Sequence, residues 1–288
     1  MEIAAGTGKL NVQSFDRLLV GAAPIWSTKP KSIHQVTLNL SQISFVDPFG
    51  LAGLAVLTES LGRRTRVPPV IVLPTNQSVT GYLSRLGAWD HLGRISELRS
   101  DAPLASHVSG QDSDVLLELS RISAAADIQK ILGNLSAIIE NNLGYSRTSV
   151  NAVMNTLSEL CQNIVDHSDT TGWAVAQRYH RSNGSCFVWI GVADAGVGIK
   201  QSLGARYPVQ NWTHFDSIVY ALKKNVSRLP NRGLGLHMVN KIVNEFRGSL
   251  HIRSGDSRLS VADRAEGIPG AWFLGTQVGI SLSENSGA

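Results

Sequence analysis

The sequence predicts an α/β protein with two domains, and three features of the chain support this. In the first hundred residues, stretches with the alternating apolar pattern of strands are followed by stretches with the period of helices. Residues 99–112 show neither period and are rich in Ser, Ala, Asp and Gly, which is typical of a linker. The second half carries three blocks of polar residues and glycines. We therefore expect domains at residues 1–98 and 113–288.

The first domain is expected to be a sheet covered by helices. An alternating strand pattern at 36–40 continues in apolar residues up to Val46, and Asp47-Pro48-Phe49-Gly50 is typical of a turn, with Asp47 as a helix N-cap or a turn residue. Leucines recur at helical spacing over 51–61, residues 70–73 form an apolar strand, and residues 79–86 predict another helix. Strand, helix, strand and helix within this length indicate a helix-covered sheet.

Two common nucleotide-binding motifs are excluded by the glycine pattern. The segment Gly6-Thr7-Gly8-Lys9 lacks the first glycine of a phosphate loop and the Ser or Thr that follows its lysine, so we expect a flexible N-terminus there. The glycine pairs near 196 and 233 do not continue to G-x-G-x-x-G after a strand. A dinucleotide-binding fold is therefore not expected.

Composition narrows the class of protein. No apolar run is long enough to span a bilayer and no signal-peptide pattern opens the chain, so we expect a cytoplasmic protein. Cys161 and Cys186 have no metal-ligand spacing. The formal charge of +4 arises in the first 100 residues and includes Arg63, Arg64 and Arg66. A solvated helix end explains these arginines better than contact with nucleic acid does.

The second domain is expected to begin with a strand at 115–119 and an amphipathic helix at 128–139. A second helix follows, with its apolar face at Val150, Val153, Leu157, Leu160 and Ile164. Residues 172–192 predict a hairpin that turns at 182–185.

The first polar block lies on the second of these helices. Glu159, Asn163 and Asp166 are four and three residues apart, so all three project from one face. A carboxylate one turn from a carboxamide suits a general base beside a Mg²⁺ ligand. The alternative is that these residues form the solvent-exposed face of an amphipathic helix. For this block taken alone, that alternative is preferred.

The second and third blocks each place glycines at the end of a regular element. Asp194 leaves the buried strand 186–192 and can accept a hydrogen bond from an adenine amino group, while Gly196 and Gly198 allow a tight turn. Gly233-Leu234-Gly235 precedes an apolar-periodic segment, so its backbone amides can hold phosphate at a helix N-terminus. Taken singly, an ordinary turn and a loop-to-helix junction are the alternatives.

In this order, and followed by Gly275-Thr276, the blocks resemble the ATP-binding domain of the GHKL superfamily, which includes gyrase, heat-shock chaperones, histidine kinases, mismatch-repair ATPases and anti-sigma serine kinases. The resemblance implies an α/β sandwich of the Bergerat type that binds ATP and Mg²⁺. It implies that Glu159 is the catalytic residue and Asn163 the Mg²⁺ ligand. The residues implied to contact the nucleotide are Asn163, Asp166, His167, Asp194, Gly196, Gly198, Ile199, Arg232, Gly233, Leu234, Gly235, Leu236 and Thr276.

The superfamily keeps its ATP lid between the second and third blocks, which corresponds to residues 200–232. Helical spacing of apolar residues over 215–222 predicts a helix in this lid. Five cations are candidate phosphate contacts, although each is also explained as a solvated side chain: Lys200, Lys223, Lys224, Arg228 and Arg232. His167 either approaches phosphate or faces solvent at a helix end. No histidine lies in an H-E-x-x-P pattern, which argues against a sensor histidine kinase.

Residues 30–98 resemble the domain named for sulfate transporters and anti-sigma antagonists, STAS, around Ser44-Phe45-Val46-Asp47-Pro48-Phe49-Gly50-Leu51. Phosphorylatable members carry serine where this chain has Pro48 and Phe49. The resemblance therefore implies a docking module. Phe49 is expected either in the domain's own core or at a docking contact.

Three functions remain open. The first is an ATP-dependent ATPase or protein-serine kinase related to partner-switching anti-sigma factors. The second is a nucleotide-gated binding protein with little turnover, and the third is a scaffold with a vestigial pocket, which the intact blocks disfavour. We expect a signalling or transcription-regulating protein as partner, or a second copy in a homodimer, and neither a membrane nor nucleic acid.

Overall fold

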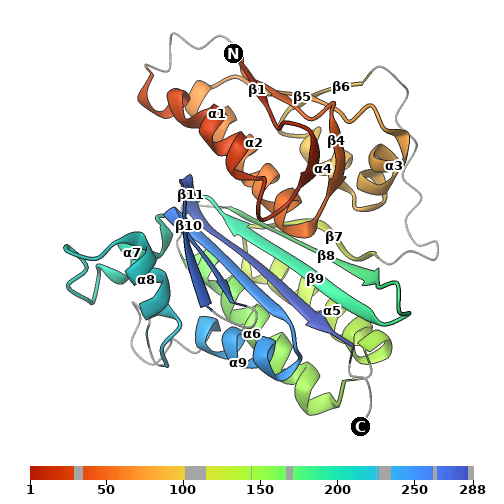
Figure 1. Cartoon of the computed structure of the whole chain (residues 1–288), viewed down its shortest axis with the longest axis vertical. Helices are drawn as coiled ribbons and strands as arrows, with labels where there is room; N and C mark the ends of the chain where they lie inside the picture. Colours follow the sequence, from red (N-terminus) through yellow and green to blue (C-terminus); the bar gives the residue numbers. More distant parts are fainter. Residues whose placement is uncertain are drawn as a thin grey trace.

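A computed structural model of the chain describes residues 1–28, 35–100, 115–143, 145–166, 171–224, 226, 235–261 and 265–284. Residues 1–100 form a helix-covered unit, here called the N-terminal unit, which lies on one face of a larger sheet (Figure 1). Residues 115–284 supply that sheet and the helices on its other face, and are here called the C-terminal unit. No helix within the described part of the chain is long and apolar enough to cross a bilayer.

The N-terminal unit contains two parallel sheets. The elements in chain order are β1 (Glu2–Ala4), β2 (Gly8–Leu10), α1 (Asp16–Ser27), β3 (Thr37–Asn39), β4 (Ile43–Val46), α2 (Pro48–Thr65), β5 (Val70–Val72), α3 (Gln77–Arg85), α4 (Ala88–Leu92) and β6 (Glu97–Arg99). Strands β1, β3, β5 and β6 form a four-stranded parallel sheet in that order, and β2 pairs with β4. The predicted helix-covered sheet is thus present.

One expectation for this unit is wrong, and one left with two alternatives is resolved. The N-terminus, expected to be flexible, forms β1 and β2, because pairing with β3 and β4 satisfies their backbone groups. Asp47, expected to be either a helix N-cap or a turn residue, is the N-cap of α2, and residues 48–50 form the first turn of that helix. The Asp47 side chain accepts the Gly50 N–H at 2.7 Å and Pro48 occupies the first helical turn, where its missing N–H costs nothing.

The C-terminal unit is a five-stranded antiparallel sheet with helices. Its elements are β7 (Val115–Ile122), α5 (Ala125–Leu143), α6 (Arg147–Asp166), β8 (Gly172–His180), β9 (Cys186–Asp194), α7 (Gly198–Leu203), α8 (His214–Ala221), α9 (Gly235–Glu245), β10 (Ser249–Val261) and β11 (Ala265–Ser283). The strand order is β10-β11-β9-β8-β7. The predicted strand at 115–119, helix at 128–139 and hairpin at 172–192 are confirmed. Of the predicted linker 99–112, Arg99 ends β6 and Ser100 follows it, while 101–112 lie outside the described residues.

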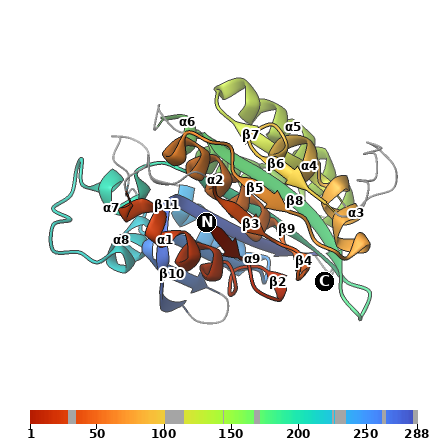
Figure 2. The ribbon, with the colours of Figure 1, turned by 90° about the horizontal axis from the view of Figure 1, so that it is seen from above.

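The two faces of the sheet belong to different hydrophobic cores. Along β8, Ala174 and Ala176 pack with the helices α5, α6 and α9, whereas Trp173 and Val175 pack with the N-terminal unit. This alternation follows from the two-residue period of a strand. Figures 1 and 2 show the resulting layers, with α5, α6 and α9 on one face and α2 on the other. The two units therefore share a core.

Helix α2 approaches the backbone of the sheet at positions where the sheet has glycine. A Cβ atom on Gly191 of β9 would overlap the Pro48 carbonyl, and one on Gly279 of β11 would lie 2.9 Å from the Phe49 ring. Phe49 is 1 % exposed and packs edge-on against Phe15 with ring centroids 6.4 Å apart. Phe49 is therefore both a core residue and a contact residue, because the core that it occupies lies between the two units.

A buried carboxylate at the other end of α2 joins the units by hydrogen bonds. Glu59 accepts from Arg121 on β7 at 2.9 Å, from Thr171 at 2.8 Å and from the Trp173 indole at 3.1 Å. It also accepts from Arg63, one helical turn away on α2, at 2.9 Å. Burial opposes ionisation, but these donors outweigh it and hold the pKa of Glu59 below its usual value.

We predict that Glu59→Ala lowers the free energy of unfolding by roughly 2 to 4 kcal/mol, because it leaves the Trp173 indole and the Arg121 guanidinium without their buried acceptor. Chemical denaturation measures the change. Arg99→Ala is the control, since Arg99 forms an exposed ion pair with Glu97 at 2.9 Å whose loss costs less than about 1 kcal/mol. Equal losses in the two variants would contradict the interpretation of Glu59 as a bridge between the units.

We also predict that Asp47 makes stability depend on pH. Burial raises the pKa of Asp47 to about 7, although the Gly50 and Phe49 amides favour its charged form. An acid whose folded pKa is raised destabilises the fold as it ionises, so stability falls as pH rises from about 4 to 7. Asp47→Asn keeps an N-cap acceptor without the charge and should gain roughly 4 kcal/mol over wild type between pH 4 and 8. A constant difference across this range would contradict the assignment.

Candidate functional site

Helix α6 carries the first polar block on the face of the sheet opposite the N-terminal unit. Its predicted apolar face is confirmed, because each of its five members is buried: Val150, Val153, Leu157, Leu160 and Ile164. Glu159 is half-buried on the other side of the helix and Asn163, one turn later, is exposed. The helix therefore presents a carboxylate and a carboxamide together outside the core. The Asp166 side chain and His167 lie outside the described residues.

Asp194 ends β9, and its carboxylate is held by two backbone amides. It accepts the Gly196 N–H at 2.7 Å and the Thr276 N–H from β11. Burial raises the pKa of Asp194 to about 6, against the opposite effect of these two amides. At neutral pH the side chain is therefore mainly an ionised acceptor in a half-buried position.

The glycines around Asp194 are required by close approach. Gly275 has φ +83°, and a Cβ atom there would lie 2.6 Å from both the Asp194 Oδ1 and the Gly196 nitrogen. Gly198 has φ +76°, and a Cβ atom there would lie 2.9 Å from the Ser254 Oγ. Both positions combine a left-handed backbone with lack of space, which only glycine accommodates. The structure thus brings Asp194, Gly196, Gly198 and the segment 275–276 together, as the sequence blocks required.

One member of this turn was missed by sequence reasoning. Ser254 on β10 donates to the Gly275 carbonyl at 3.0 Å and accepts the Ile199 N–H at 2.9 Å. Ile199, a predicted site residue, is buried at the start of α7. Nothing in the local sequence distinguishes Ser254 from the other serines of β10, so pairing of distant strands alone reveals it.

The third block is described only in part. Gly235 begins α9, and the predicted apolar periodicity is confirmed by the buried side chains of Val239, Ile242 and Val243. Leu236 is half-buried against the core of α5 and α6. Arg232, Gly233 and Leu234 lie outside the described residues, so their contact with phosphate stays a prediction.

The segment between the second and third blocks contains the predicted helix. Helix α8 begins with a capping box in which the Asp216 carboxylate accepts the Thr213 N–H at 2.8 Å and the Thr213 hydroxyl accepts the Asp216 N–H at 3.0 Å. Lys200 lies in α7, and Lys223 places its ammonium 4.9 Å from the centre of the Tyr220 ring. Lys224 is exposed, while Arg228 is not among the residues described. Lys200, Lys223 and Lys224 remain candidate phosphate contacts.

A Mg²⁺ ion would need few protein ligands at this site. Within the described ranges no group of three or more His, Cys, Asp or Glu could hold a metal ion by itself. Mg²⁺ commonly keeps several waters and binds through one or two protein oxygens together with substrate phosphates. The exposed amide oxygen of Asn163, one helical turn from Glu159, fits that mode of binding.

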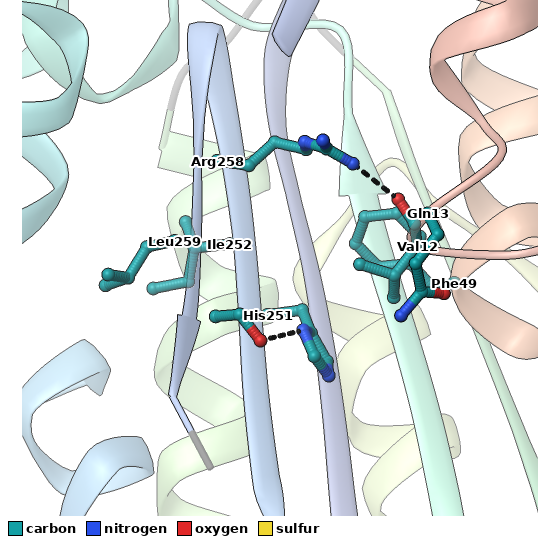
Figure 3. A pocket seen from close by; sticks show the side chains of 8 residues that line it. Val12, Gln13, Phe49, His251, Ile252, Arg258 and Leu259 are labelled. Atoms are coloured by element: carbon teal, nitrogen blue, oxygen red, sulfur yellow. Dashed lines mark hydrogen bonds between the residues drawn. The ribbon is translucent and has the colours of Figure 1, made fainter. Parts of the chain in front are cut away.

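A separate small pocket of ≈ 100 Å³ lies where β10 meets the N-terminal unit (Figure 3). Its wall includes Arg258, which donates to the Val12 carbonyl at 3.0 Å, and His251, which shares a 2.9 Å hydrogen bond with Ser260. Burial lowers the pKa of His251 to about 4, so the ring is neutral at pH 7. The lining contains none of the predicted nucleotide contacts, and the pocket is distinct from the turn around Asp194.

Comparison with protein families agrees with the geometry of the C-terminal unit. Residues 148–283 match the family model described as histidine kinase-, DNA gyrase B-, and HSP90-like ATPase. This match includes α6 with Glu159, the Asp194 turn and the two long strands β10 and β11. No curated protein matches the chain. A histidine kinase-, DNA gyrase B- and HSP90-like ATPase domain therefore occupies residues 148–283 of this chain.

Proposed function

We propose that this protein is a cytoplasmic signalling protein that binds Mg²⁺-ATP and uses it either for hydrolysis or for phosphorylation of a protein serine, in the manner of partner-switching anti-sigma factors. The observation that carries the proposal is the buried turn that presents the ionised Asp194 beside Gly196 and Thr276. A carboxylate held by backbone amides can accept the amino group of adenine without reorganising. The ATPase family match at residues 148–283 supports the nucleotide assignment.

Glu159 is the residue we assign to the chemical step. A half-buried carboxylate on α6 can take the proton from an attacking serine hydroxyl or water, while Asn163 one turn away contributes an oxygen ligand for Mg²⁺. Bound Mg²⁺ would neutralise charge on the phosphates. The helix positions both side chains rigidly, because its opposite face is buried along its whole length.

A nucleotide-gated switch with little turnover is the second candidate, and the close contact between the units favours it. We propose that residues 1–98 are a STAS-like docking module, since Pro48 and Phe49, which stand where phosphorylatable relatives have serine, are buried against the sheet. The expected partner is a signalling or transcription-regulating protein, with a homodimer as the alternative. A change in the lid on ATP binding could then alter the surface offered to that partner.

We predict that Asp194→Asn weakens ATP binding by roughly 1 to 3 kcal/mol at pH 8, the cost of mismatching a buried polar partner. Because the pKa of Asp194 is about 6, the wild-type carboxyl becomes protonated below that pH and the two proteins should converge in affinity at pH 5. Calorimetric titration measures both affinities, and their ratio cancels the titration of ATP itself. Asp90→Asn, an exposed change on α4, is the control. Equal affinities at pH 8 would remove the adenine assignment.

We predict that Glu159→Ala retains ATP and loses hydrolysis or phosphotransfer by about 10²- to 10⁴-fold, the usual contribution of a positioned base. Phosphate release and transfer to a candidate protein from labelled ATP are the measurements. Glu140→Ala, an exposed change on the neighbouring helix α5, should leave both unchanged. Turnover in Glu159→Ala equal to that of wild type would contradict the role of Glu159, and absence of turnover in wild type would favour the switch.

A further inference from the structure

The turn that presents Asp194 is fixed by a single buried hydroxyl. Ser254 is 1 % exposed, and its two hydrogen bonds connect the Gly275 carbonyl on β11 with the Ile199 amide at the start of α7. Thr276, which follows Gly275, donates its own N–H to the Asp194 carboxylate. Because Ser254 is buried, loss of the hydroxyl would remove one hydrogen bond from each of these two backbone groups. Ser254 therefore sets the spacing of the two segments that flank the carboxylate.

The neighbouring pair of residues on the same two strands is held by the N-terminal unit. In the antiparallel register Ser254 lies opposite Thr276, and Arg253 lies opposite Gln277. The Gln277 side chain donates to the Phe49 carbonyl at 2.8 Å, and the Gly53 position of α2 has no room for a Cβ beside it. Arg253 forms an ion pair with Asp16 in the first turn of α1. The N-terminal unit therefore contacts both strands next to the turn, β11 through Gln277 and β10 through Arg253.

The ion pair between Arg253 and Asp16 carries a desolvation cost, because Arg253 is completely buried. Its Nε and Nη2 atoms have no hydrogen-bond partner among the residues described, and burial lowers its pKa. Asp16 also binds Arg258 at 3.0 Å and accepts the Ala271 N–H of β11 at 3.1 Å. One carboxylate of the N-terminal unit therefore compensates two guanidinium groups and holds β11 as well. Removing its charge would force Arg253 and its strand to rearrange.

We propose that the N-terminal unit determines adenine recognition through these adjacent residue pairs, with Ser254 as the positioning residue and the contact between Asp16 and Arg253 as the constraint. The inference rests on the proposed role of Asp194 in binding adenine. An adenine amino group donates to that carboxylate, whereas guanine presents a carbonyl oxygen at the same place. The preference for ATP over GTP therefore reports the geometry of the turn, separately from binding of the phosphates.

The first test compares ATP and GTP affinities of Ser254→Ala by calorimetry. ATP affinity should fall about tenfold, since one to two buried hydrogen bonds of ordinary strength are lost, while GTP affinity should change little. Ser249→Ala is the matched control: Ser249 also lies on β10 and its hydroxyl is hydrogen-bonded, to Ser281 at 2.8 Å, but outside the turn. A Ser254→Ala protein with the wild-type ratio of ATP to GTP affinity would overturn the role of Ser254.

The second test asks whether the N-terminal unit acts through this turn. Asp16→Asn should lower the ratio of ATP to GTP affinity several-fold, and combining it with Ser254→Ala should lower the ratio by less than the product of the single effects. Tyr82→Phe removes a 2.9 Å hydrogen bond to Tyr179 elsewhere in the same interface and should leave the ratio unchanged. If Asp16→Asn does not fold, Gln277→Met removes the adjoining bond to Phe49 and should give the same shift.

An unchanged ratio in folded Asp16→Asn or Gln277→Met would overturn the coupling between the units. An equal fall in Tyr82→Phe would also overturn it, because a general loosening of the interface would then explain the effect. Failure of the wild-type protein to bind ATP would remove the proposed function and this inference together. Wild-type ATP binding with no response to these variants would remove the inference alone.

Discussion

The close contact between α2 and the backbone of the central sheet is the constraint on which the rest of the structure depends. Gly191 and Gly279 leave no room for side chains where Pro48 and Phe49 meet the strands. Any larger residue there would push the helix away and expose the apolar face that includes Trp173 and the neighbouring strand residues. The N-terminal unit is therefore an integral layer of the protein, because it covers a sheet face that would otherwise be in water.

Polar contacts determine how this layer is oriented. Apolar burial is nondirectional, so it favours the contact without selecting one rotation of the unit on the sheet. Glu59, with its donors on β7 and β8, and Asp16, with Arg253 on β10, lie at separate places and are each satisfied in one arrangement. A rotation or slip would leave buried charges unpaired, which costs far more than the loss of an exposed ion pair.

The same strands that carry this layer also carry the turn around Asp194. Asp194 ends β9 and Ser254 lies on β10, and β11 runs between these two strands. The residues that we propose for the chemical step belong to α6, on the face of the sheet opposite the N-terminal unit, where the packing of α5 and α9 holds the helix. The turn and α6 pack in the same core, which includes Ile199 after the turn and Leu160 and Ile164 on the helix, whereas Arg253 and Gln277 next to the turn contact the N-terminal unit.

Sequence patterns alone predicted much of this protein, for physical reasons that act locally. Helical periodicity identified α2, α5, α6, α8 and α9, because one apolar face per helix must be buried. Asp194 with Gly196 and Gly198 was identifiable because a strand exit, an acceptor and two permissive residues lie within five positions. The strands β1 and β2 were missed, since each is three residues long and stable only through its parallel partner.

Only the tertiary structure decided how the parts act on one another. The sequence did not decide whether Phe49 has a core role or a docking role. In the structure it has both, because it lies in a core that the two units share. Ser254 and Arg253 carry no local signal, because their importance comes from register with Thr276 and Gln277 and from contact with Asp16, more than two hundred residues away in the chain. Local chemistry determines which residues can bind a nucleotide, whereas contacts between distant segments determine what holds them in place.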